Sequence, residues 1–235
     1  MARARSSKKG IFSTGVWDRS LADGEEEMSA RAYVTTVVFV TLLGIATVTA
    51  SSALAIHDNI QPTLGLSVFV LVLGLAGCFV SAIPSVFAKT LGLVMIAGPF
   101  GLLLGPVAAQ YHATSVVKIA SVTLGMTAGL GAIGIVYPKS LEGWGSFLLG
   151  GLWALLFAMI IVPFGAMFGL NIVPAWHVLD ALGIVLFSGL IIYDFNRAMR
   201  VPKTFLNAFD VGIQIYLDVI NVFLRLLELF GQKKN

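Results

Sequence analysis

The stretch WGSFLLGGLWALLFAMIIVPFGAMFG, residues 144–169, decides the class of fold because it contains no Asp, Glu, Lys or Arg. A helix of about 20 apolar residues is as long as the hydrocarbon core of a bilayer is thick. Six further segments are mostly apolar and of similar length, and the predicted spans are 32–55, 61–82, 86–110, 115–137, 174–195 and 206–230. Helices satisfy their own backbone hydrogen bonds in lipid. The sequence therefore predicts an all-α, polytopic membrane protein, a bundle of seven transmembrane helices.

The composition excludes an ordinary soluble enzyme. Of 235 residues, 57% are hydrophobic and 11% are charged, whereas a soluble domain has about 25% charged residues. The single cysteine, Cys78, excludes an intrachain disulfide. Pro163 lies inside the quoted stretch, and we still predict one continuous helix there, because neighbouring helices can satisfy the carbonyl that a proline leaves free.

The charged residues predict the orientation and the ends of the chain. Residues 1–31 are polar and carry six Lys or Arg residues, so we predict a largely disordered cytoplasmic tail, followed by a membrane domain at 32–231 and a polar tail at 232–235. With the N-terminus inside, eleven of the 15 Lys and Arg residues lie on the cytoplasmic side. This excess follows the positive-inside rule. The lipid bilayer is the expected partner, and no nucleic acid is expected.

Glycines mark the third and fourth spans as packing faces. Small residues allow membrane helices to approach one another closely. The glycines concerned are Gly92, Gly98, Gly101, Gly105, Gly125, Gly129, Gly131 and Gly134. We expect close helix contacts at these positions and no chemistry.

The last span carries a polar stripe on one face. An ionisable side chain in hydrocarbon costs about 2.5–3.5 kcal/mol on insertion scales, so each one needs an explanation. At 100° per residue, seven polar side chains fall in a stripe about 80° wide. They are Asn207, Asp210, Gln214, Asp218, Asn221, Arg225 and Glu228. We predict that this face is turned toward protein or water and not toward lipid.

The sixth span adds two more carboxylates, Asp180 and Asp194, about 40° apart on the same wheel. The two spans are consecutive and antiparallel, so their polar faces can meet. At a rise of about 1.5 Å per residue, Asp218 lies about 18 Å along the last span and Asp210 about 6 Å. Ideal geometry thus favours Asp210 as the partner of Asp194, but an irregular connection would favour Asp218 instead.

Carboxylates that meet in this environment have a definite chemistry. Two of them in a low dielectric do not both ionise easily and titrate as a pair. Their oxygens also suit a hard cation such as Ca²⁺. Protons and cations would compete for the same oxygens, which predicts a pH-dependent cation site or gate. The alternative is that the polar groups are hydrogen-bonded contacts that only hold the helices together.

Two stretches of the chain resemble a known family. FSGLIIYDFNR at 187–197 is similar to the sixth helix of the Bax inhibitor-1 (transmembrane Bax-inhibitor-motif) family, and IYLDVINVFLRLLELFG at 215–231 is similar to its final helix. GLLLGP at 101–106 and LEGWGSFLLGG at 141–151 add weaker support. The resemblance covers most of residues 32–231 and is to bacterial-type members, which implies the bacterial inner membrane.

The resemblance implies a bundle whose last helix is central, and a pH-sensitive calcium leak that is not an enzyme and needs no cofactor. Asp194 and Asp218 would be the paired aspartates that sense pH, form the gate and contact the transported Ca²⁺. The residues that would line the ion pathway or support the pair are Asp180, Asp210, Gln214, Asn221 and Arg225.

The chain also departs from the family pattern. Many bacterial relatives carry a basic cluster between spans two and three that locks the pair closed, but here only Lys89 is available as a latch. Asp180 and Asp210 are unusual for the family. We expect them to add negative charge to the pathway, so that the protein attracts cations but is gated differently.

Two other functions remain as alternatives. An intramembrane aspartyl protease also uses two aspartates on adjacent helices, and Tyr193-Asp194 matches the first half of its pattern. The second half requires Gly-x-Gly-Asp, whereas this chain has Tyr216-Leu217-Asp218. The third function is that of a membrane regulator that transports nothing.

Overall fold

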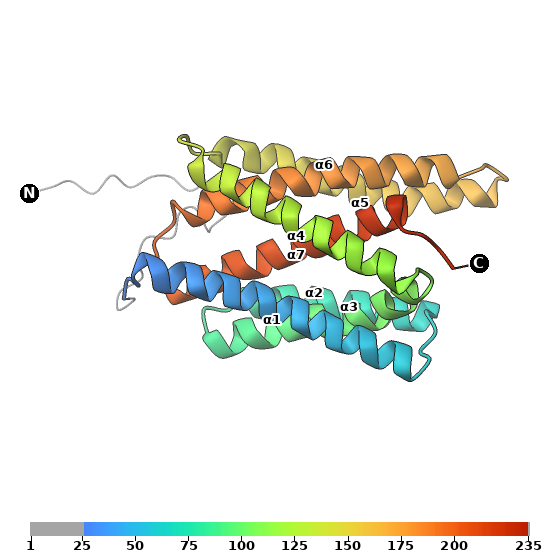
Figure 1. Ribbon diagram of the computed structural model, residues 1–235, viewed down its shortest axis with the longest axis horizontal. Coiled ribbons are helices and arrows are strands. Elements are labelled where there is room, and N and C mark those ends of the chain that lie inside the picture. Colours follow the sequence, from blue (N-terminus) through green and yellow to red (C-terminus); the bar gives the residue numbers. More distant parts are fainter. Residues whose placement is uncertain (1–25, 235) are drawn as a thin grey trace, which may run out of the picture.

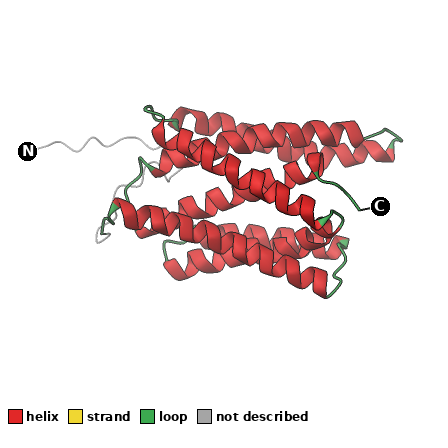
Figure 2. Cartoon of the chain, in the orientation of Figure 1, coloured by secondary structure: helices red, strands yellow, loops and turns green. Residues whose placement is uncertain are grey.

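The computed structural model describes residues 26–234, and Figure 1 shows their arrangement. The helices are α1 (Ala30–His57), α2 (Leu64–Ser81), α3 (Val86–Ala109), α4 (Ala113–Val136), the short 3₁₀ helix η1 (Glu142–Trp144), α5 (Gly145–Met167), α6 (Val173–Ala198) and α7 (Phe205–Phe230). In Figure 2 the described residues consist of helices and loops, with no strand among them. The all-α prediction is confirmed, and every predicted span agrees with a helix to within three residues.

Local sequence explains where several of the helices begin. Ser29, Thr63 and Thr204 are N-caps whose hydroxyls accept hydrogen bonds from backbone N–H groups at the starts of α1, α2 and α7. Such caps satisfy N–H groups that have no partner within the helix. Helix α5 continues through Pro163, as predicted. Of the predicted cytoplasmic tail, residues 1–25 lie outside the described residues.

Six of the seven helices, α1 to α6, are long and apolar enough to cross a membrane. Helix α7 has 26 residues, a sufficient length for a span, but its polar side chains lower its mean hydropathy. Six such helices make the chain a polytopic membrane protein. That α7 is a seventh span stays a prediction, which rests on its length and on its place among the other helices.

The helices form two groups with α7 between them. Helices α1 and α2 contact α3, and helices α4 and α5 contact α6. Helix α7 contacts α1 and α3 of the first group and α4 and α6 of the second, and Figure 1 shows it running obliquely between the groups. It also has the most buried residues of the seven helices. These contacts do not show that all six other helices enclose α7, so its central position in the bundle stays a prediction.

The glycines of α3 and α4 explain how closely the helices approach. A Cβ atom on Gly101 would lie 2.5 Å from the Val48 carbonyl oxygen of α1, and one on Gly134 would lie 2.4 Å from the Ile192 carbonyl oxygen of α6. Among the glycines of α3 and α4, those whose added Cβ would meet another helix at under 3.0 Å are Gly92, Gly101, Gly105, Gly131 and Gly134. The expected packing role is confirmed at these five positions. It is wrong for Gly98, Gly125 and Gly129, which face open space because they point away from neighbouring helices.

Replacing Gly101 with Ala is expected to destabilise the bundle by about 1–3 kcal/mol, because the new methyl group overpacks the α1–α3 contact. Gly98→Ala is the matched control, since it lies on the same helix and faces open space. Both changes raise helix propensity equally. Unfolding in mixed detergent micelles measures the difference, and equal stabilities of the two variants would contradict the packing role.

Candidate functional site

The structure brings Asp194 and Asp218 together between α6 and α7. Asp194 lies in the last two turns of α6, and Asp218 lies in the middle of α7. Asp194 is 5% exposed and Asp218 is 6% exposed, and their side chains lie close enough to interact. Two carboxyl groups this close in a buried site do not both ionise easily, and one proton between them relieves their repulsion.

The aspartate pair lies on the wall of a pocket of about 510 Å³ between α5, α6 and α7. A water molecule occupies about 30 Å³ in the liquid, so the pocket has room for several waters or for a partly hydrated cation. Its α5 side consists of Gly145 and three leucines, so that helix contributes no charged group. The polar lining comes from α6 and α7 and consists of Tyr193, Asp194, Arg197, Gln214, Asp218 and Asn221.

The ideal-geometry expectation that Asp210 would meet Asp194 is wrong. Residues 199–204 carry the chain away from the end of α6 before α7 begins (Figure 1). Asn207 holds this connection by donating a hydrogen bond from its side-chain nitrogen to the Pro202 carbonyl oxygen at 2.8 Å. Asp218 lies 13 residues into α7, or about 20 Å along its axis. The displaced start of α7 therefore brings Asp218, and not Asp210, level with Asp194.

Arg197 is a site residue that reasoning from the sequence missed. It follows Asp194 by about one turn of α6, is buried, and lines the same pocket. Its Nη1 donates a hydrogen bond to Oε1 of Gln214 at 2.9 Å. The guanidinium is positive at any ordinary pH, so the aspartate pair with one shared proton and Arg197 together carry no net charge. The sequence did contain a signal for Arg197, because Phe195-Asn196-Arg197 directly follow Asp194 and place the arginine about one turn further along the same helix.

Asn196 is a second residue that was missed, and its role is in positioning. Its side-chain nitrogen donates to the Gly134 and Lys139 carbonyl oxygens at 3.1 Å, and its Oδ1 accepts from the Leu141 N–H at 3.0 Å. These bonds tie the end of α6 to the connection between α4 and α5. They hold the last turns of α6, and with them Asp194, in one position.

Lys89 pairs with Asp210 and not with the aspartate pair. Its side chain is 0% exposed and forms an ion pair with Asp210 between α3 and α7. Its Nζ also donates to the Ser81 carbonyl oxygen at 3.1 Å. The expectation that Asp210 adds negative charge to the pathway is therefore wrong, because the ammonium of Lys89 balances the charge of its carboxylate.

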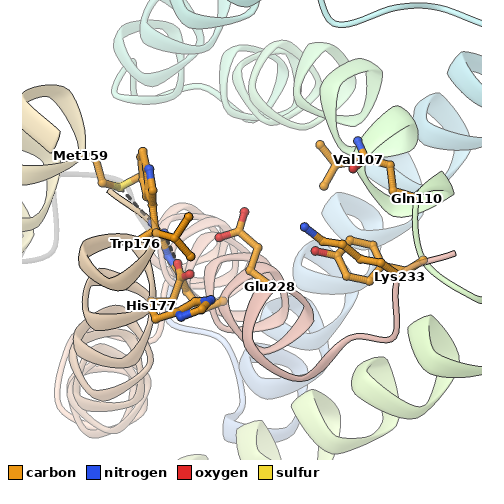
Figure 3. A pocket seen from close by; sticks show the side chains of 11 residues that line it. Val107, Gln110, Met159, Trp176, His177, Glu228 and Lys233 are labelled. Atoms are coloured by element: carbon orange, nitrogen blue, oxygen red, sulfur yellow. Dashed lines mark hydrogen bonds and ion pairs between the residues drawn. The ribbon is translucent and has the colours of Figure 1, made fainter. Parts of the chain in front are cut away.

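Asp180 likewise has a basic partner. Nη1 of Arg225 donates to its Oδ1 at 2.8 Å, and both residues are buried. Asp180 also lies close enough to Glu228 for the two carboxyl groups to interact. Asp180, Arg225 and Glu228 line a separate pocket of about 530 Å³ (Figure 3). The expectation that Asp180 adds negative charge is wrong for the same physical reason as for Asp210.

The aspartate pair offers few ligands for a resident metal. Among the described residues, no group of three or more His, Cys, Asp or Glu side chains could hold a metal ion. Ca²⁺ takes 6–8 oxygen ligands, and Oε1 of Gln214 is already bonded to Arg197. Oδ2 of Asp218 is buried without a hydrogen-bond partner within residues 26–234.

Fold and site together define a class, a multi-pass membrane protein with a buried carboxyl pair between its last two helices. A comparison of sequences identifies the family. The family model described as "Inhibitor of apoptosis-promoting Bax1" matches residues 30–235. The chain belongs to the Bax inhibitor-1 family.

Individual relatives agree with this assignment. An uncharacterized protein of Borreliella burgdorferi is 30% identical over 143 residues, the inner membrane protein YbhL of Escherichia coli is 26% identical over 143 residues, and Bax inhibitor 1 of Schizosaccharomyces pombe is 28% identical over 141 residues. Each match covers 57% of this chain and, in that order, 60%, 59% and 49% of the relative. The chain thus spans about half to three fifths of the length of these relatives.

Proposed function

We propose that the protein is a pH-sensitive cation leak channel, with Ca²⁺ as the transported ion, gated by protonation of Asp194 and Asp218. The observation that carries this proposal is a buried pair of neighbouring carboxyl groups on the wall of a polar pocket. Ionisable groups inside membrane helices are rare and mark ion or proton pathways. Membership of the Bax inhibitor-1 family supports a membrane function of this kind but does not specify it.

Competition between protons and cations is the proposed gate. With one shared proton, the aspartate pair and Arg197 are neutral, and this proton holds α6 against α7. When the proton leaves, two carboxylates repel each other and their oxygens become available to a divalent cation. The other charged group that lines the pocket is Arg197, beside Asp194 on α6, and α5 presents no titratable side chain there. Cation flux should therefore increase as pH rises.

The pathway we propose follows the seam between α6 and α7, with α7 as the central helix. The N-terminus would lie in the cytoplasm, because eleven of the 15 Lys and Arg residues then lie inside. In this orientation Lys89 and Asp210 lie near the cytoplasmic end of the bundle. Their buried ion pair would act as a latch that fastens α3 to α7 at this end.

Purified protein in liposomes loaded with a calcium indicator is expected to pass Ca²⁺ faster as pH is raised from about 6 to 8, because the aspartate pair then loses its shared proton. Protein-free liposomes under the same pH steps are the control. A flux that does not change with pH would contradict the proposed gate. Protein-containing liposomes that pass no Ca²⁺ at any pH would favour a regulator that transports nothing.

Proteolysis is the competing proposal, since paired aspartates in a membrane pocket also suit that reaction. The same liposomes, with a helical reporter peptide added, separate the two functions. We expect the reporter to remain intact. Cleavage that disappears in Asp194→Asn would establish a protease instead.

A further inference from the structure

A second polar pocket lies at the end of the bundle that contains the start of α6 and the end of α7. Its floor is the buried ion pair of Asp180 and Arg225, and Glu228 lies on its wall. Lys233, just after the end of α7, also lines it. Figure 3 shows the side chains of Glu228 and Lys233 turned toward each other across this pocket.

The position of Lys233 is fixed by the backbone on both sides of it. The His112 N–H donates to the Gln232 carbonyl oxygen at 2.9 Å, and the Lys234 N–H donates to the Gln110 carbonyl oxygen at 2.8 Å. These two bonds form an isolated antiparallel bridge in which Lys233 lies opposite Tyr111. Residues 232–234, which belong to the polar tail predicted at 232–235, form a strap on the connection between α3 and α4.

The strap directs the ammonium of Lys233 toward the acidic side of the pocket. Nζ lies 5.7 Å from the centre of the Tyr111 ring, within the range of a cation–π contact. It also lies near enough to Glu228 for the two charges to interact. Two carboxylates, Asp180 and Glu228, are thus balanced by two cations, Arg225 and Lys233. One of these cations, Arg225, is buried, and the other, Lys233, is held by two backbone hydrogen bonds of the strap.

We propose that Lys233 is a tethered cation that occupies the outer mouth of the α6–α7 pathway and excludes free divalent cations from it. The proposal rests on the proposed cation leak, because a mouth is meaningful only if ions pass. Release of the strap would expose Glu228 and the floor of the pocket to solution. An entering cation would then replace Lys233 as the charge that balances Glu228.

Terbium, a luminescent substitute for Ca²⁺, tests this with a readout that does not depend on flux. Trp176 lines the pocket and would transfer excitation to bound terbium. In a full-length protein with Trp17, Trp144 and Trp153 changed to Phe, Lys233→Gln is expected to tighten terbium binding about tenfold, because one repelling charge is removed at short range. Adding Glu228→Gln to Lys233→Gln should abolish this gain.

Lys234→Gln is the matched control, since the Lys234 side chain bonds to the Ala109 carbonyl oxygen and does not line the pocket. Equal terbium affinities in Lys233→Gln, Lys234→Gln and the parent would overturn the proposal. Calcium flux through liposomes should rise several-fold in Lys233→Gln alone. Terbium binding could rise in Lys233→Gln while neither this variant nor the parent passes Ca²⁺. That result would contradict the proposed cation leak and would still support the occupancy of the pocket by Lys233.

Discussion

Replacing Asp218 with Asn is expected to reduce calcium flux at about pH 8 by tenfold or more and to remove its dependence on pH. A unit charge at about 4 Å contributes a few kcal/mol at an effective dielectric of about 20, so losing one carboxylate removes much of the attraction for a divalent ion. Asparagine keeps the shape of the side chain and cannot release a proton in this range. Flux through liposomes across the pH series measures both effects.

The pair should behave as a unit. Asp194→Asn is expected to have the same two effects, and the double variant should be no worse than either single variant, because one missing member already disables the shared proton. Glu142→Gln is the control for charge alone, since Glu142 is exposed in η1 and does not line the pocket. A pH-dependent flux that survives both aspartate changes would rule out this gate.

Replacing Lys89 with Met is expected to destabilise the bundle by about 3 kcal/mol. The change preserves most of the side-chain volume but removes the cation that balances the Asp210 carboxylate between α3 and α7. Leaving one member of a buried ion pair without the other is strongly destabilising. Unfolding in mixed detergent micelles at constant pH measures the loss.

The double variant Lys89→Met/Asp210→Asn should recover part of that stability, because it no longer buries an unbalanced charge. Lys118→Met is the matched control on α4, where the lysine is exposed, and it should change stability by less than about 0.5 kcal/mol. Equal losses of stability in Lys89→Met and Lys118→Met would contradict a stabilising role for the ion pair of Lys89 and Asp210.

The three acidic clusters of α6 and α7 differ in what neutralises them. Asp180 has Arg225, and Asp210 has Lys89. Asp194 and Asp218 have each other, with a single cation, Arg197, beside them. The third cluster therefore has two carboxyl groups for one cation, whereas Asp180 and Asp210 each form an ion pair with a basic side chain.

The sequence predicted the helices well because the signals for them are local. A run of apolar residues specifies a span wherever it lies, and seven polar side chains at helical spacing specify a polar face. The same polar face distinguishes α7 from the six helices that are long and apolar enough to cross a membrane. The family could also be identified from sequence, since the motifs around Asp194 and Asp218 are contiguous.

The partners within the site could not be predicted in this way. Ideal geometry favoured Asp210 for Asp194, and only the direction of residues 199–204 reverses that choice. The ion pair of Lys89 and Asp210 joins residues 121 positions apart. The sequence predicted that Asp180 and Asp210 add negative charge to the pathway, but in the structure Arg225 and Lys89 balance these two charges.

The sequence by itself determined seven helical segments, their lengths and the polar face of the last one, because hydrophobicity and helical period act over a few turns. Tertiary structure alone decided which acids meet, which bases neutralise the others and where Lys233 lies. Those outcomes depend on how far one helix is displaced along its neighbour, and that displacement is set by connections and by packing across the whole bundle.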